Sequence, residues 1–230
     1  MLLSFIENEM KLKIYIFRHG QTYYNKYHIF TGWKDSRLTP NGVKQAKIVA
    51  KKLKNKKIDV AYTSDLSRCK DTLKQVLKYH PECKQKIIDW RLRERSYGKL
   101  EGHHHSKLIE IHGEQDYKTF LHLHKIGHNL RGKERQEFIK KHGEADLQII
   151  RRSYNLRPPG GENMLIVEKR VYAFIKDMLK KMKKEKVNVA ISASGNSMRP
   201  FRRYFGHLSL NQMMKLENPW DDYFEYTINV

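Results

Sequence analysis

The amino-acid sequence predicts an α/β fold with a largely parallel central sheet that helices cover on both faces. Short apolar runs have the β-branched and aromatic composition of buried strands. They are Ile14–Phe17, Ile58–Tyr62 and Val187–Ser192. Segments with helical periodicity separate these runs, and this alternation is typical of a parallel sheet. Each run stops at a sharp turn, so the three turns should share one pocket at the carboxyl edge of the sheet.

The first helix is expected to start with Thr39 as its cap and Pro40 in its first turn. Its apolar face comprises Val43, Ala46, Val49, Ala50 and Leu53. The second helix follows Ser64 and carries Arg68 in its first turn, facing the sheet edge. Its inward residues are Leu66, Cys69, Leu73, Val76 and Leu77.

A long helix is expected before the third strand. Its apolar face comprises Val167, Val171, Phe174, Ile175, Met178 and Met182. A turn at residues 194–196 follows that strand, and the alternation from Tyr223 to Val230 predicts a last strand. The length of 230 residues suits a single domain spanning residues 1–230.

Composition narrows the class of protein. No window holds the roughly 18 consecutive apolar residues of a membrane span, and residues 1–6 lack the features of a signal peptide. We therefore expect a soluble, cytoplasmic protein with no membrane partner. Cys69 and Cys83 form neither a disulfide framework nor a metal pair, so both are expected to be thiols.

The formal net charge of +21 would attract polyanions. Many lysines fall on solvated helix faces, and no nucleic-acid-binding motif accompanies them. We expect no specific nucleic-acid partner. A small substrate with several phosphates and a carboxylate would benefit from the same field.

The motif Arg18-His19-Gly20 directly follows the first predicted strand. A histidine at this edge is placed to attack a phosphoryl group, while the arginine binds the phosphate oxygens in a two-pronged way. Taken alone, the tripeptide favours a simpler interpretation, a loop histidine beside a surface arginine.

Five sequence blocks, which occur in the order and spacing of a known family, decide between these interpretations. They are Arg18–Thr22 with Asn25 and Phe30–Trp33, Thr63–Arg68, Arg91–Gly98, Arg151–Tyr154 with Pro158-Pro159, and Gly195–Arg199. On these blocks the chain resembles the histidine phosphatase superfamily, and within it the 2,3-bisphosphoglycerate-dependent phosphoglycerate mutases. The resemblance implies a three-layer α/β/α sandwich with a mostly parallel central sheet.

The resemblance also implies the roles of the site residues. His19 would be the nucleophile that becomes a phosphohistidine, Arg18 and Arg68 would hold the phosphoryl oxygens, and Glu94 would be the general acid and base. Without the block, Glu94 would simply be a surface ion-pair partner of its arginine neighbours. The substrate-binding set is Asn25, Thr31, Gly32, Tyr97, Arg151, Arg152, Gly195 and Asn196. The paired arginines favour a mutase over a phosphatase, because simple phosphatases of the superfamily generally lack that block.

Ser194 stands where the superfamily has its second catalytic histidine. Loss of one preorganised donor to the transition state costs about 3 to 4 kcal/mol. Either the protein has diverged toward low activity, or serine has replaced an original histidine in order to disable the enzyme. The matching neighbours favour the second alternative.

A second departure is His105, which takes the position of a substrate-binding lysine, although Lys107 could reach the same ligand. The histidines of this region could suggest a metal site. They are His103, His104, His105, His122, His124 and His128. Consecutive histidines cannot all face one ion, so we expect a polar loop and no metal.

A third departure is an insertion at about 114–147, predicted as two short helices. Their apolar residues are Phe120, Leu121, Leu123, Ile126, Phe138 and Ile139, with Gly127, Asn129 and Gly132 between them. The repeated His-Gly-Glu at 112–114 and 142–144 hints at a local duplication. A lid over the site and an added surface subdomain or dimer contact explain the insertion equally well.

The sequence thus predicts a phosphoglycerate mutase of glycolysis and gluconeogenesis that is primed by 2,3-bisphosphoglycerate, uses no metal and is impaired by Ser194. One alternative is a histidine phosphatase of small esters, because the chain ends at Val230 without the longer tail of many mutases. Another is a catalytically silent relative that binds phosphorylated ligands. A homo-oligomer is possible in each case.

Overall fold

The computed structural model describes residues 10–124 and 130–230. Within these ranges, five strands form one sheet in the order β3-β2-β4-β1-β5. The strands are β1 (Lys11–Arg18), β2 (Val60–Thr63), β3 (Gln85–Ile88), β4 (Val189–Ala193) and β5 (Tyr223–Asn229). Only the edge strand β5 runs antiparallel to its neighbour in this sheet, so the prediction of a mostly parallel sheet is confirmed.

Helices cover both faces of the sheet and create two cores. The helices α2 (Pro40–Leu53) and α3 (Ser67–Val76) pack on one face, against Tyr15 and Phe17 of β1. The helices α6 (Met164–Glu185) and α7 (Gly195–Gly206) pack on the other face, against Ile14 and Ile16. Alternate residues of β1 therefore enter opposite cores, as the pleat of a strand requires. The predicted three-layer sandwich is confirmed.

The predicted start of α2 is also confirmed. The hydroxyl of Thr39 accepts a hydrogen bond from the backbone N–H of Gly42 at 3.0 Å, and Pro40 occupies the first turn. Cys69 and Cys83 are free and buried. Among the described helices, none combines the length and apolar character needed to cross a membrane.

Several short elements were not predicted. The strand β3 is mostly exposed at the sheet edge, so it carries little of the apolar signal that marks the inner strands. The others are the helices α1 (Tyr23–Lys26) and α8 (Leu210–Lys215) and the 3-10 turns Leu77–Tyr79, Trp90–Leu92 and Gly98–Leu100.

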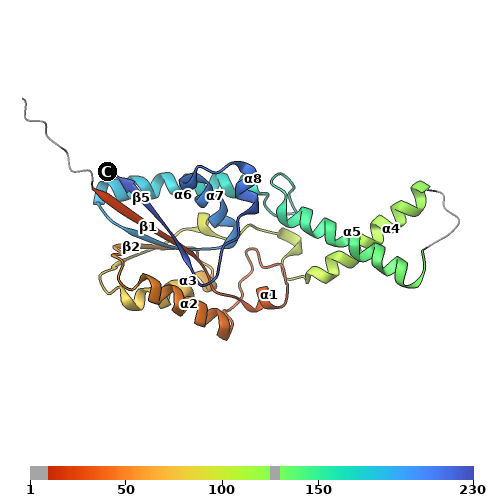
Figure 1. The fold of residues 1–230 in the computed structure, drawn as a ribbon, viewed down its shortest axis with the longest axis horizontal. Coiled ribbons are helices and arrows are strands. Elements are labelled where there is room, and N and C mark those ends of the chain that lie inside the picture. Colours follow the sequence, from red (N-terminus) through yellow and green to blue (C-terminus); the bar gives the residue numbers. More distant parts are fainter. Residues whose placement is uncertain (1–9, 125–129) are drawn as a thin grey trace, which may run out of the picture.

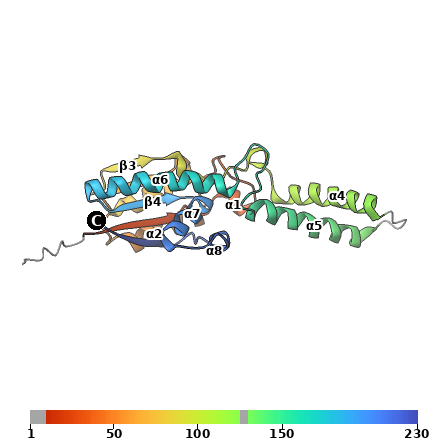
Figure 2. The same cartoon turned by 90° about the horizontal axis from the view of Figure 1, so that it is seen from above.

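The predicted short helices of the insertion are wrong in length. They are the helices α4 (His105–His124) and α5 (Gly132–Arg152), of 20 and 21 residues. The two helices lie side by side and project from the sheet domain (Figures 1 and 2). We call this pair the arm. Gly132 begins α5 rather than lying between the helices, while the predicted positions Ile126, Gly127, His128 and Asn129 lie outside the described residues.

Glycines bring the helices of the arm into backbone contact. A Cβ atom on Gly113 would lie 2.0 Å from the carbonyl oxygen of Ile139, and one on Gly143 would lie 2.0 Å from that of Ile109. This close crossing needs few large apolar residues. The apolar periodicity of α4 is correspondingly weak, which explains why this helix seemed short in the sequence.

The contacts at the crossing repeat with an internal symmetry. His112 of α4 contacts Asp146 of α5 at 2.8 Å, and His142 of α5 lies 3.9 Å from Asp116 of α4. The duplicated His-Gly-Glu motif thus places two equivalent histidine–aspartate contacts between the two helices.

Candidate active site

A pocket of about 320 Å³ opens at the carboxyl ends of β1, β2 and β4. With the exception of Ser194, every residue that the sequence predicts for the site lines it. These residues are Arg18, His19, Asn25, Thr31, Gly32, Arg68, Glu94, Tyr97, Arg151, Arg152, Gly195 and Asn196. Segments that are far apart in the sequence therefore meet as the turn argument predicted.

His19 is held rigidly at the end of β1. Its backbone N–H donates to the carbonyl of Ala193 at 3.1 Å, which ties it to the end of β4. Its ring Nδ1 lies 2.8 Å from the carbonyl oxygen of Gly20. Because a carbonyl can only accept, Nδ1 carries the proton, and Nε2 keeps the lone pair that a nucleophile needs.

The environment keeps this imidazole uncharged. Burial lowers the pKa of His19 well below 6.5, and the nearby charges of Arg68 and Arg18 lower the pKa further. The hydrogen bond to Gly20 opposes these effects only in part. A neutral histidine between two cations is suited to attack an electron-poor phosphorus atom.

Two arginines flank His19 and are fixed by backbone carbonyls. Arg68 is fully buried and donates to the carbonyls of Gly32 at 2.7 Å and Lys34 at 3.0 Å. Arg18 donates to the carbonyl of Asn218 at 3.2 Å. Burial lowers the pKa of Arg18 to about 10, so its guanidinium remains charged at neutral pH.

Both guanidinium groups retain a free donor. The Nε atoms of Arg18 and Arg68 are buried and have no hydrogen-bond partner among the described residues. Buried donors without acceptors are costly, and a bound oxyanion would satisfy them. The pair therefore fits a phosphate group beside His19.

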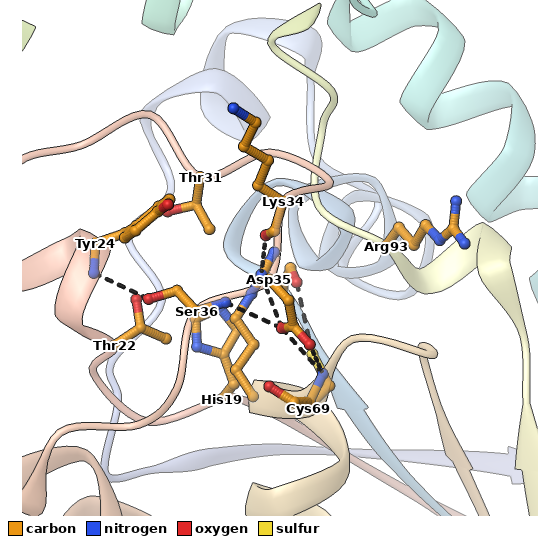
Figure 3. A network of polar contacts seen from close by, with 12 residues as sticks. His19, Thr22, Tyr24, Thr31, Lys34, Asp35, Ser36, Cys69 and Arg93 are labelled. Carbon is orange, nitrogen blue, oxygen red and sulfur yellow. Dashed lines mark hydrogen bonds and ion pairs between the residues drawn. The ribbon is translucent and has the colours of Figure 1, made fainter. Parts of the chain in front are cut away.

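A network of polar contacts holds the loop after α1 (Figure 3). Asp35 accepts hydrogen bonds from the backbone N–H of Ser67, at the start of α3, at 3.1 and 3.0 Å. Ser36 accepts from the backbone N–H of Tyr24 at 3.1 Å. These contacts fix the carbonyls of Gly32 and Lys34 that orient Arg68.

Glu94, Tyr97 and Asn196 line one wall of the pocket, and Asn196 lies in the first turn of α7. The Glu94 carboxylate accepts from the backbone N–H of Arg95 at 2.7 Å and from that of Asn196 at 3.3 Å. The side-chain amide of Asn196 donates to the Tyr97 hydroxyl at 3.4 Å. Burial raises the pKa of Tyr97, which keeps that hydroxyl protonated.

Arg151 and Arg152 enter the pocket from the last turn of α5. The fully buried Arg95 secures this helix end by donating to the carbonyl of Ile150 at 2.9 Å. Arg152 itself donates to the carboxylate of Glu217 at 2.8 Å. The arm thus supplies the second group of cations in the pocket.

The remaining substrate-binding candidates are supported by local contacts. The Asn25 side chain accepts from the backbone N–H of Thr22 at 3.1 Å in the short helix α1. Thr31 donates to the carbonyl of Ile29 at 3.4 Å. Gly32 has a φ of 51°, a conformation that favours glycine. Gly195 accepts through its carbonyl from the amide of Asn218 at 2.8 Å.

Ser194 occupies a different place from the other candidates. It is fully buried before the first residue of α7, and its hydroxyl lies 3.6 Å from the sulfur of Cys69. It is absent from the described pocket lining. The serine side chain therefore adds no donor at the pocket surface.

His105 lines the pocket, whereas Lys107 is directed elsewhere. Lys107 pairs with Glu110 at 3.2 Å on the outer face of α4. The ring centroid of His105 lies 4.4 Å from that of Phe30. Burial, followed by the charge of Arg151, lowers the pKa of His105 to about 4. Lys107 is therefore not among the residues that line the described pocket.

Further residues that line the pocket are outside the set of site residues predicted from the sequence. They are Tyr24, His28, Ile29, Phe30, His105, Arg199, Glu217, Asn218 and Trp220. Phe30 and Arg199 lie within the recognised blocks and could have been found there. Glu217, Asn218 and Trp220 lie in a loop without a motif, and only the fold brings them to the pocket.

Comparison with known proteins supports the same family. Residues 14–127 and 124–227 match the profile of the histidine phosphatase superfamily (branch 1). A 2,3-bisphosphoglycerate-dependent phosphoglycerate mutase of Methanococcus vannielii is 32% identical over 203 residues, which cover 88% of this chain and 84% of the relative.

Solved structures match the fold at lower identity. Mycobacterial hydrolase 1 has a TM-score of 0.70 at 20% identity and covers 95% of this chain and 92% of its own. A phosphoglycerate mutase from Bacillus anthracis has a TM-score of 0.63 at 21% identity, with 96% and 93% covered. Because a hydrolase and a mutase match about equally well, the fold alone does not select the reaction.

Proposed function

Because this chain belongs to the histidine phosphatase superfamily and, within it, to the 2,3-bisphosphoglycerate-dependent phosphoglycerate mutase family, we propose that it interconverts 3-phosphoglycerate and 2-phosphoglycerate through a phosphohistidine at His19. The reaction would take place in the cytoplasm as a step of glycolysis and gluconeogenesis. One observation carries the choice of a mutase. Within the described residues, two groups of arginines line one pocket, Arg18 with Arg68 beside His19 and Arg151 with Arg152 from the arm.

In the proposed reaction, Nε2 of His19 attacks the phosphorus atom in line with the ester oxygen of the substrate. The P–N bond forms as the P–O bond breaks, and the electron pair of that bond stays on the leaving oxygen. Glu94 would donate the proton which that oxygen needs, and in the reverse step it would remove a proton from the attacking hydroxyl. Arg18 and Arg68 would stabilise the charge on the equatorial oxygens.

Two features of the pocket support the proposal that 2,3-bisphosphoglycerate is the primer. One phosphate would satisfy the free Nε donors of Arg18 and Arg68, while Arg151 and Arg152 would hold the carboxylate or the other phosphate. When bound, this compound supplies the phosphoryl group that primes the enzyme. The proposed mechanism requires no metal.

Ser194 is proposed to make this chain a weak mutase. A donor missing from the transition state lowers the rate by about 10² to 10³. The experiment is a mutase assay on 3-phosphoglycerate, with and without 2,3-bisphosphoglycerate, that compares the chain with its Ser194→His variant and records free phosphate. We expect the histidine to raise primer-dependent isomerisation by at least about 10².

Because Ser194 is fully buried, the variant is first checked by its melting temperature. Trapping of labelled phosphohistidine gives a second readout that needs no change at position 194, with His19→Asn as the negative control. Absence of both isomerisation and phosphohistidine in a folded variant would refute an enzyme and favour a silent phospho-ligand-binding relative.

A phosphatase of small esters is the second candidate. It is favoured by the uncharged pocket wall of Phe30 and His105, because His105 replaces a cation that would select carboxylates. Free phosphate released from several esters, without the need for a primer, would move the assignment to this function.

A further inference from the structure

The loop between α8 and β5 forms one side of the pocket. Residues 216–220 of this loop are here called the strap. Glu217, Asn218 and Trp220 of the strap all line the pocket. The proposed reaction assigns no role to these three residues.

The backbone of the strap is fixed at several points. Arg202 donates to the carbonyl of Glu217 at 2.6 Å and to the side chain of Asn218 at 2.8 Å. The amide of Asn218 donates to Gly195, and Arg18 donates to the carbonyl of Asn218. None of these contacts uses the carboxylate of Glu217, so a change in that carboxylate leaves the anchoring of the strap intact.

The Glu217 carboxylate instead forms an ion pair with Arg152, one of the arginines that line the pocket. It accepts from Arg152 at 2.8 Å. Partial burial raises the pKa of Glu217, but the hydrogen bond from Arg152 and the charges of Arg152, Arg199 and Arg18 outweigh this effect and lower the pKa overall. The carboxylate is therefore charged at neutral pH inside an anion-binding pocket. Its side chain is 74% exposed, so an incoming anion can compete with it for Arg152.

We propose that Glu217 is a specificity-determining residue that acts as an internal competitor for the distal anionic group of the substrate. By holding Arg152, it lowers the affinity for ligands that carry a second phosphate or carboxylate. The phosphate site at His19 is affected less, because Glu217 acts on Arg18 through charge alone and makes no hydrogen bond to it. This inference rests on the proposed function, because it assumes that phosphoglycerates are the ligands.

The test uses the full chain and isothermal titration calorimetry with two probes, 2,3-bisphosphoglycerate and inorganic phosphate. Glu217→Gln should bind bisphosphoglycerate about threefold to fivefold more tightly, the range expected when one exposed ion pair is lost. Binding of inorganic phosphate should tighten by less than about twofold, because Glu217 acts on its site at Arg18 and Arg68 only through charge and without a hydrogen bond. Glu217→Asp, which keeps the charge, should behave like the unchanged chain.

Glu185→Gln is the matched control, because Glu185 pairs with Lys181 at 2.8 Å on an exposed part of α6 outside the pocket lining. It removes the same charge from the molecule and should leave both affinities unchanged. Equal shifts for both probes, no shift in Glu217→Gln, or the same shift in Glu185→Gln would each overturn the role of Glu217.

The two proposals fail separately. A selective gain in Glu217→Gln with no isomerase activity in Ser194→His would keep the role of Glu217 and reject the mutase. Isomerase activity without the selective gain would do the reverse. A lack of bisphosphoglycerate binding by every variant would reject both.

Discussion

At the scale of single residues, the site depends on a histidine that stays neutral while cations surround it. The lowered pKa of His19 means that it is uncharged in the folded chain at pH values where an unfolded histidine takes up a proton. The same holds for His105, whose pKa is about 4. These two histidines link the catalytic site to the stability of the fold.

This linkage predicts acid sensitivity. Below the ordinary histidine pKa of about 6.5, the unfolded chain binds protons that the folded chain does not. The free energy of unfolding should therefore fall as the pH drops from about 6.5 toward 4, by at most about 1.4 kcal/mol per pH unit for each histidine. Urea denaturation at pH 7.5, 6 and 5 measures this slope. His105→Asn should have a shallower slope, and an unchanged slope would contradict the assignment to His105.

Prediction from sequence succeeded where a residue belongs to a motif tied to a strand end. His19 and Arg68 could be placed because a glycine turn or a helix start follows an apolar run. Glu217 and Trp220 could not, because nothing in their local spacing indicates that the strap returns to the pocket. Ser194 was identified, but its burial beside Cys69 requires the fold.

At the scale of elements, the inner strands and α2, α3 and α6 were predictable because each buries a continuous apolar face. The strand β3 escaped prediction because it is short and mostly exposed. The arm helices were underestimated because glycine and backbone contact, rather than a wide apolar stripe, joins them. A repeated tripeptide is the one sign of that contact which could be seen before the fold was known.

The arm provides a prediction at this scale. Alanine in place of glycine usually stabilises a helix by about 1 kcal/mol. Gly143→Ala should do the opposite, because its Cβ would meet the carbonyl oxygen of Ile109 at 2.0 Å. Separation of the helices should cost about 1 to 3 kcal/mol and lower the melting temperature. Gln148→Ala, at an exposed position of the same helix, is the control, and equal melting temperatures for both variants would disprove the close crossing.

At the scale of the whole molecule, the net charge of +21 acts on every anionic ligand that approaches. A field of this sign raises the rate of encounter with phosphoglycerates, and salt screens it over about 8 to 10 Å. We expect kcat/KM of the Ser194→His variant to fall severalfold between 50 and 300 mM salt, mostly through KM. Activity assays at constant pH and a series of salt concentrations measure this dependence. A kcat/KM that does not change with salt would contradict a contribution of the net charge to substrate binding.

The arm joins the pocket to a distant point of the molecule. Its helices reach the pocket at His105 and at Arg151 with Arg152, while their other ends project away from the sheet (Figure 2). A helix of 20 residues is about 30 Å long, so a tilt of about 10° at the pocket moves the far end by about 5 Å. The arm would thus amplify a small change of helix orientation at the pocket into a larger displacement at its far end. Energy transfer between two fluorophores, one on the outer part of α5 and one on the sheet domain, would report the binding of an anion at Arg151 and Arg152 as a change of distance.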